Sequence, residues 1–367
     1  MIDFKFHVVS LIAVFMALAV GILLGAGPLG GAIGDTLSSQ LQDLRADREQ
    51  MREELSSVRG DLDRTNEYLE TGGPQFVDGT LDGGRIALLA VPGTNGNDIE
   101  SVRESIVAAG GQVVAEGVLT DAMTEVGGAA DRAEIAASLG LDVPAGTDPA
   151  VPVGDLVADA LTVGHDEDIV LDSQEEDRLL VESLLAADPQ PLALQDEPDG
   201  RADAIVLVTS RTMPIPQIDP GADEDEDGTS DLDAASDERR AELILSLQTY
   251  DAMAAQAPFV VVGAAQSEWD LVGLLRSEPD LAGGVVTVDS VGEVVASVTA
   301  PLAAAAAIDG LVEHYGFDDG ADALVPPPVP APSETRPLAP PTVTPELPTG
   351  STETPTTSAE APTGGSS

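Results

Sequence analysis

Histidine, methionine and carboxylate side chains are the residues of this sequence that could hold a metal ion. His314 is followed by Tyr315, Asp318 and Asp319, which makes it a weak candidate ligand for a divalent cation. The alternative is a histidine near a helix C-terminus that interacts with the helix dipole. The chain has no cysteine, and its methionines are dispersed, so soft thiolate and thioether ligands are not gathered at any point. The six methionines are Met1, Met16, Met51, Met123, Met213 and Met253.

The loops that follow the expected strands lack the spacings of known catalytic motifs. Loop 92–98 lacks the G-x-G-x-x-G and G-K-[ST] spacings, and Asn97 or Asp98 would suffice there as a helix N-cap. Ser210 follows another strand without a G-x-S-x-G motif, and the chain has only three histidines. We expect no catalytic site and no organic cofactor. A membrane-tethered enzyme that uses loop 92–98 is the least supported alternative.

The net charge of the chain limits which kinds of molecule it can bind. The formal net charge is −49. Nucleic-acid binding needs basic patches that displace counterions, so we expect no nucleic-acid partner. The acidic run at 219–227 could bind Ca²⁺ or Mg²⁺, but it lacks the spacing of a calcium loop and is typical of a solvated acidic loop.

Alternating strands and helices predict an α/β domain over residues 84–316. Runs of β-branched and aliphatic residues predict five strands, and the strand-helix-strand order predicts a doubly wound, mostly parallel sheet. The expected strands are 84–93, 112–119, 204–209, 259–263 and 285–288. The expected helices are 98–109, 132–139, 174–186, 237–255, 268–275 and 302–315.

An uncharged run near the N-terminus predicts a membrane-spanning helix. No charged side chain lies between Val8 and Gly34, and an apolar helix of about 20 residues crosses a hydrocarbon core. We expect a cytoplasmic segment at 1–6 and an uncleaved signal anchor at 7–29. A cleaved signal peptide is the alternative. Gly21 and Gly25 form a G-x-x-x-G pair that could bring two such helices close together.

The orientation of this anchor is predicted from charge. Lys5, the only lysine, precedes the run, and positive charge favours the cytoplasmic side. We therefore expect a single-pass protein of the cell membrane with most of the chain outside the cytoplasm.

A heptad pattern begins soon after the apolar run and predicts a coiled coil over 36–71. Its apolar positions follow alternating spacings of four and three residues, although Arg48 and Thr65 interrupt the seam. The alternative is a helix that packs on its own globular domain. We define the seam as Leu37, Leu41, Leu44, Met51, Leu55, Val58, Leu62 and Leu69.

Charges beside the seam predict a parallel homodimer. In a parallel pair, each g position meets the next e position of the partner. This would place Asp47 beside Arg52 and Glu54 beside Arg59, whereas an antiparallel pair would oppose like charges. At 1.5 Å per residue the helix would be a rod of roughly 50 Å. A hetero-partner is the alternative.

From about residue 325 the composition changes to proline, threonine, serine and glutamate. Too few apolar side chains remain there to offset the entropy of ordering, so we expect a disordered tail at 325–367.

Two parts of the sequence resemble the actinobacterial copper transporter family called MctB-like. One is the apolar stretch from His7 to Gly25, followed directly by the heptads. The other is Val285-Val286-Thr287-Val288-Asp289-Ser290-Val291 together with His314-Tyr315-Gly316. The resemblance covers most of residues 1–320, and its N-terminal block is the more specific part.

The resemblance implies an actinobacterial cell-envelope protein assigned to copper efflux and copper homeostasis. SteB-like relatives further imply a role in septum formation, with an envelope or division protein as partner. The residues themselves show no clustered Cu(I) ligands, so copper would be a transported or sensed ion rather than a resident cofactor. The alternative function is a dimeric scaffold that recruits or regulates cell-wall or division machinery.

Overall fold

The computed structural model describes residues 3–26, 28–162, 173–211, 231–267, 269–278 and 283–328. The acidic run at 219–227 and all but the first four residues of the predicted tail lie outside these ranges. The side chains of residues 24–39 are also outside the described set, and they include Gly25 and Leu37 of the predictions above.

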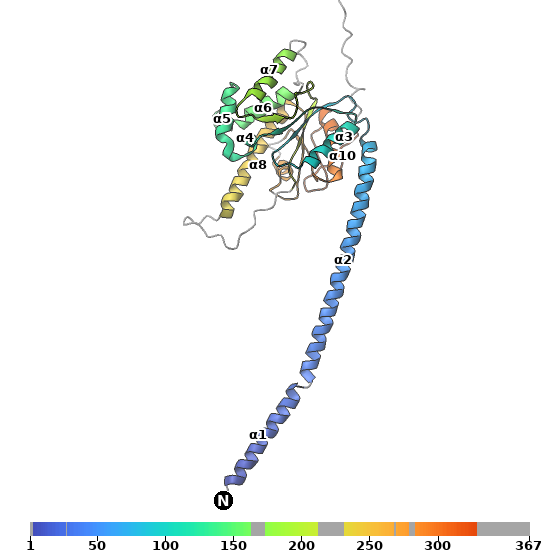
Figure 1. The fold of residues 1–367 in the computed structure, drawn as a ribbon, viewed down its shortest axis with the longest axis vertical. Helices are drawn as coiled ribbons and strands as arrows, with labels where there is room; N and C mark the ends of the chain where they lie inside the picture. Colours follow the sequence, from blue (N-terminus) through green and yellow to red (C-terminus); the bar gives the residue numbers. More distant parts are fainter. Residues whose placement is uncertain are drawn as a thin grey trace, which may run out of the picture.

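Two long helices, α1 (Asp3–Ala26) and α2 (Pro28–Val77), form the N-terminal part of the chain (Figure 1). The helix α1 is apolar and long enough to cross a membrane over Phe4–Leu23. The helix α1 ends at Ala26 and α2 begins at Pro28, with residue 27 outside the described ranges.

The C-terminal end of α2 differs from the prediction. The predicted coiled coil stops at residue 71, before the helix-breaking residues Gly72, Gly73 and Pro74, but α2 continues through them to Val77. Its last turns pack against the α/β domain: Val77 is buried, and a Cβ atom on Gly73 would lie 2.8 Å from a methyl group of Val298. Tertiary packing therefore overrides the local stop signals, and only a residue without a side chain permits so close an approach.

A seven-stranded sheet forms the centre of the α/β domain, with strand order β3-β2-β1-β4-β5-β6-β7. All neighbouring pairs are parallel except β2 with β3. The strands are β1 (Arg85–Ala90), β2 (Gln112–Leu119), β3 (Leu192–Leu194), β4 (Ala204–Val208), β5 (Phe259–Val262), β6 (Val285–Val288) and β7 (His314–Tyr315). The five predicted strands are confirmed, and the two edge strands β3 and β7 were missed.

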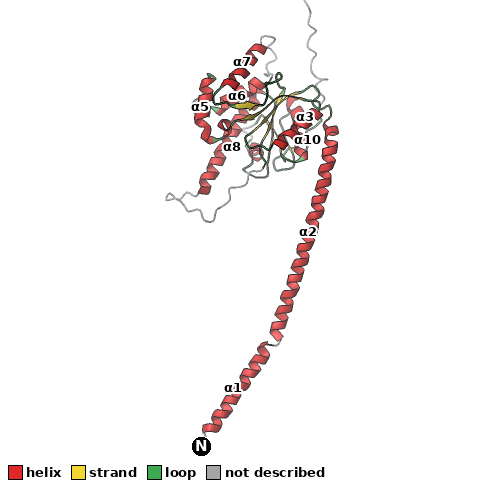
Figure 2. Ribbon diagram, in the orientation of Figure 1, coloured by secondary structure: helices red, strands yellow, loops and turns green. Residues whose placement is uncertain are grey.

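Helices cover both faces of the sheet, which confirms the doubly wound α/β class (Figure 2). On one face, α3 (Gly96–Ala108) and α10 (Val294–Ile308) pack with residues such as Ile86 and Val206. On the other, α6 (Ala150–Leu161) and α8 (Asp231–Gln256) pack with the alternate residues, such as Ala87 and Leu207. The remaining helices are α4 (Asp121–Thr124), α5 (Ala129–Ser138), α7 (Ser173–Ala186), α9 (Leu271–Ser277) and the 3-10 turn η1 (Val126–Gly128).

The last helix corrects another prediction. A helix was expected over 302–315, but α10 begins at Val294 and ends at Ile308. Burial of small side chains such as Ala300 and Ala304 against the sheet offsets the hydrogen bond lost at Pro301. Gly310, with a φ of 84°, then ends the helix. His314 is consequently on a strand.

Candidate functional site

A ligand would be expected at the carboxyl ends of β1 and β4, which are neighbouring strands in the centre of the sheet. The chain continues from β1 through α3 to β2 on one side, and β4 on the other side leads towards α8 on the opposite face. Where the winding direction changes in this way, the loops diverge and leave a crevice. Loop 92–98 and residues Thr209–Arg211 surround this point.

An ion pair joins the two sides of the crevice. The Arg211 guanidinium donates from Nε to Oδ2 of Asp98 at 2.9 Å and from Nη2 to Oδ1 at 2.7 Å. Asp98 is buried, Arg211 is about half exposed, and the carboxylate raises the pKa of Arg211 through this hydrogen bond. A Cβ atom on Gly292 would lie 2.3 Å from Arg211 Nε, so this glycine permits the guanidinium to approach the backbone before α10. The pair fixes α3 to the end of β4.

Asp98 therefore has a role different from the predicted one. The N-cap of α3 is Asn95, whose side chain accepts a hydrogen bond from the backbone N–H of Asn97 at 2.9 Å. The expectation that Asn97 or Asp98 would cap the helix is thus wrong. The pairing of Asp98 with Arg211 has no local sequence signal, because 113 positions separate the two residues.

Two hollows open on either side of the ion pair, and Arg211 lines both. The larger, of about 530 Å³, lies between the end of α2, α3 and the start of α10. The smaller, of about 350 Å³, lies between the ends of β1, β4 and β5 and one face of α8. Both combine apolar surfaces with hydroxyl, carboxylate and guanidinium groups, an arrangement suited to hydrogen-bonding a polar ligand.

A second ion pair, between Arg276 and Asp289, organises the edge of the sheet near β7. Arg276 Nη1 donates to Asp289 Oδ2 at 3.0 Å, and both side chains are at most 2% exposed. The Asp289 carboxylate also accepts the backbone N–H groups of Phe317 and Asp318 at 3.1 and 2.9 Å. Burial alone would raise the pKa of Asp289, but these hydrogen bonds outweigh it and lower the pKa.

This network unites the two segments near the end of the domain on which the sequence resemblance rests. Asp289 belongs to the segment 285–291, and Gly316 belongs to the segment 314–316. A Cβ atom on Gly316, whose φ is 134°, would lie 2.0 Å from Asp289 Oδ1. The residues that carry this part of the resemblance thus contact each other and fix the chain after β7 to the end of β6.

The surroundings of His314 exclude the helix-dipole alternative, because this residue lies on β7. Thr287 Oγ1 accepts the Nε hydrogen of Arg276 at 3.0 Å and lies 3.0 Å from Nδ1 of His314. The hydroxyl can therefore donate to Nδ1, which leaves Nε2 as the nitrogen that carries the proton. Asp318 and Asp319 do not join His314: their backbone carbonyls accept hydrogen bonds from Arg276. Among the residues that the structure describes, no group of three or more histidine, aspartate or glutamate side chains is placed to hold a metal ion.

The environment of His314 predicts a pH dependence of stability. Burial lowers its pKa below the ordinary value of 6.5 and outweighs the opposite effect of Asp322, while the charge of Arg276 lowers it further. Because the folded-state pKa is the lower one, His314 contributes stability above pH 6.5 that is lost as the pH falls below that value.

We expect the free energy of unfolding, measured in urea between pH 7.5 and 5.0, to fall more for the native protein than for His314→Asn. Asparagine can still accept the Thr287 hydrogen bond but does not titrate. Equal pH dependence in the two proteins would contradict the assignment.

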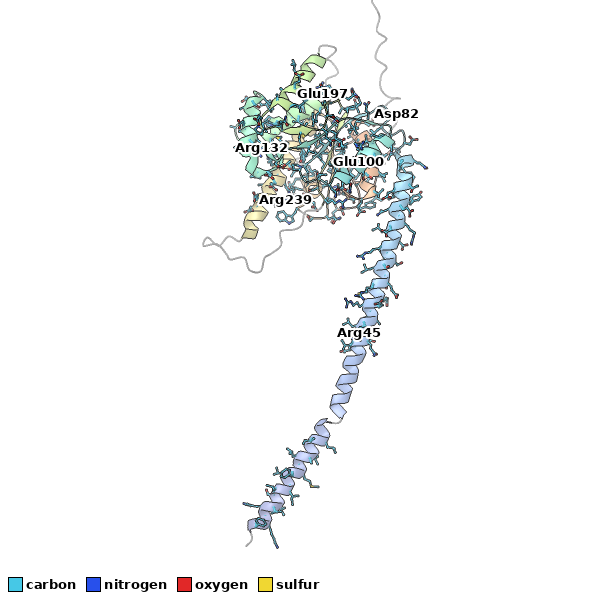
Figure 3. The ribbon with its side chains drawn as sticks, in the orientation of Figure 1. Arg45, Asp82, Glu100, Arg132, Glu197 and Arg239 are labelled. Atoms are coloured by element: carbon cyan, nitrogen blue, oxygen red, sulfur yellow. The ribbon has the colours of Figure 1, made fainter. Side chains whose placement is uncertain are left out.

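The predicted seam of α2 faces solvent from Leu41 to Leu62. From Leu41 to Leu62 its apolar side chains are 46–64% exposed, and only Leu69, beside the larger hollow, is partly buried. Figure 3 shows this part of α2, including Arg45, away from the α/β domain. The alternative in which the helix packs along its own domain therefore holds only for its last turns, and the coiled coil stays a prediction.

The described methionines do not come together. Met16 is on α1 and Met51 is on α2, while Met123 and Met253 are buried in the core beside the sheet. Gly21 lies within α1 and has no other atom near its Cβ position. Neither a thioether cluster nor a helix pair through the G-x-x-x-G residues is formed within the single described chain.

Comparison with known proteins gives a match along most of the chain. A family model described as "Copper transport outer membrane protein, MctB" matches residues 1–326. Proteins named "Copper transporter MctB" from Mycobacterium bovis and from two strains of Mycobacterium tuberculosis are each 29% identical over 174 residues. That stretch is 45% of this chain and 54% of each relative, so the chain spans about half the length of the curated relatives it matches.

Proposed function

This chain belongs to the MctB family of copper transport proteins, and on that premise we propose that it is a membrane-anchored envelope protein that acts in copper efflux and copper homeostasis. The observation that carries the proposal is the extent of the family match, residues 1–326, which includes α1, α2 and the whole α/β domain. The names of the mycobacterial relatives support the same process. In this proposal α1 is the anchor, with Lys5 on the cytoplasmic side and the α/β domain outside.

In this proposal copper is an ion that is transported or sensed, not a cofactor bound permanently by the protein. Cu(I) prefers thiolate and thioether ligands, and the described thioethers lie on four separate elements. The described donors therefore do not fit a preformed Cu(I) site within one chain. We propose that the protein supports copper export as a part of a larger assembly, because α1, the one helix of the described residues that could span a membrane, cannot enclose a path for an ion by itself.

A deletion strain complemented with the native gene tests this proposal. We expect the deletion to raise cell-associated copper and to lower the copper concentration that permits growth, and we expect complementation to reverse both effects. Zinc and manganese tolerance serve as controls for general envelope damage. Unchanged copper content and tolerance would contradict a role in copper homeostasis.

Titration with copper distinguishes direct copper binding by this protein from an indirect role in copper homeostasis. The full chain in detergent micelles is titrated with Cu(I) and with Cu(II), and His314→Ala is the matched variant. We expect no stoichiometric site that depends on His314, because Thr287 occupies Nδ1 and no further histidine, aspartate or glutamate cluster is described there. Micromolar binding that this variant abolishes would instead make copper binding a property of the α/β domain.

The proposal includes a parallel homodimer formed through the seam. Its support is the row of exposed apolar side chains on α2 and the g–e charge pairs, such as Glu54 with Arg59 of a second copy. Two copies anchored by α1 in one membrane would also have their α2 helices parallel.

A second candidate function is a scaffold for cell-wall or division proteins. It is favoured by the 50-residue helix α2, which extends the chain away from the α/β domain and exposes an apolar face. Altered septa or lysis in the deletion strain at unchanged cell copper would favour this function over copper export.

A further inference from the structure

The smaller hollow beside α8 has the features of a ligand site that neither the family match nor the copper proposal assigns. Its volume of about 350 Å³ lies at the lower end of the range for small-molecule sites, about 300–1,000 Å³. The ends of three parallel strands meet there, through Gly93 after β1, Ser210 after β4 and Ala264 after β5. One face of α8 forms the wall, with Arg239, Ser246 and Tyr250.

Arg239 is the residue that indicates the ligand. Its side chain is three-quarters buried, and its Nε is buried without an acceptor among the residues that the structure describes. Its other contacts are long: Nη1 is 3.4 Å from Glu242 Oε2, and Nη2 is 3.5 Å from the carbonyl oxygen of Trp269. Protein hydrogen bonds of this kind ordinarily measure about 2.7–3.2 Å.

Two almost fully buried arginines of the domain, Arg132 and Arg276, use all of their nitrogens by comparison. Arg132 on α5 donates to Asp148 at 2.7 and 3.0 Å and to two backbone carbonyls at 2.8 and 2.6 Å. Arg276 uses all three of its nitrogens at distances from 2.8 Å. A buried charged donor without an acceptor destabilises the folded state. Arg239 thus differs from Arg132 and Arg276, and an acceptor supplied by a ligand would complete its hydrogen bonds.

We propose that this hollow binds a small ligand through a carboxylate or phosphate group seated on Arg239. A guanidinium presents parallel donors that match two oxygens of such a group. Ser246 adds a hydroxyl group on the same face of α8, two turns further along. Asp121 and Glu125 are exposed at the rim, so the remainder of the ligand carries neutral or cationic groups rather than further negative charge.

Titration of the full chain in detergent micelles with three defined probes tests the site: inorganic phosphate, succinate and glycylglycine. We expect saturable heat and a raised melting temperature with at least one probe, since a ligand that binds only the folded state stabilises it. Glycylglycine, which has a carboxylate and an ammonium group, matches the acidic rim. A preference for phosphate would identify a phosphorylated ligand instead.

The matched variants are Arg239→Met and Arg240→Met. Arg240 is the neighbouring exposed arginine of α8, so its replacement removes the same charge outside the hollow. We expect Arg239→Met to weaken binding of the preferred probe at least 10-fold and Arg240→Met to leave it within about 2-fold, where tenfold corresponds to about 1.4 kcal/mol. Ser246→Ala is a milder second variant and is expected to weaken binding several-fold.

Two results would overturn the proposal: no saturable binding of any of the three probes, or equal binding by the native protein and Arg239→Met. Neither result bears on copper tolerance, so the test stands apart from that of the proposed function.

Discussion

Replacing Asp289 by alanine is expected to lower the free energy of unfolding by about 3–5 kcal/mol, the cost of removing one partner of a buried ion pair. The substitution leaves the Arg276 guanidinium buried without its carboxylate and frees the backbone N–H groups of Phe317 and Asp318. These groups hold the chain after β7, so the edge of the sheet should open before the rest of the domain. Urea denaturation measures the loss, and hydrogen exchange of residues 314–318 locates it.

Asp319→Ala is the matched control for this prediction. The Asp319 side chain is exposed, and only its backbone carbonyl faces Arg276, so we expect a change within about 0.5 kcal/mol. Comparable losses in the two variants would show that the buried pair is not what stabilises this edge.

Substitution of two seam leucines is expected to dissociate the proposed dimer. In Leu55→Asp/Leu62→Asp, two apolar a positions become charged and face each other across a parallel pair. The lost burial is about 1.5–3 kcal/mol per leucine. Because both copies carry the two substitutions, four leucines are lost and association would weaken by about 10⁴–10⁸-fold, at about 1.4 kcal/mol per tenfold. Light scattering of the full chain in micelles measures the mass.

The control carries the same added charge on the outer face of the helix. Ser56→Asp/Ser57→Asp occupies b and c positions, so we expect the mass of the native protein. A monomer for the native chain, or a dimer that survives the seam substitutions, would contradict the parallel coiled coil.

The central strands could be predicted because of where they lie. Strands β1, β4, β5 and β6 are buried on both faces, and such strands are continuous runs of valine, isoleucine and leucine with clear ends. The edge strands β3 and β7 have three and two residues, and pairing with a neighbour defines them more than their own composition. A reading of local pattern therefore placed His314 in a helix.

The side chains at the candidate sites depend on contacts between distant segments. Asp98 meets Arg211 across 113 positions, and Arg276 reaches carbonyls more than 35 positions away. No spacing rule connects such residues. The signal present in the sequence was an aspartate directly after a strand, as Asp289 follows β6, which is typical of the functional edge of a parallel sheet but does not identify its partner.

The stiffness of α2 has a consequence for where the α/β domain can meet other molecules. At 1.5 Å per residue, its 50 residues span about 75 Å, whereas a flexible chain of that length would have a mean end-to-end distance of about 40 Å. A flexible tether would let the domain sweep through all heights and touch the lipid. With α1 in a membrane, as proposed, the rigid helix would keep the domain near one distance from the bilayer. Its effective concentration would then be high for molecules at that distance and low for those at the bilayer surface.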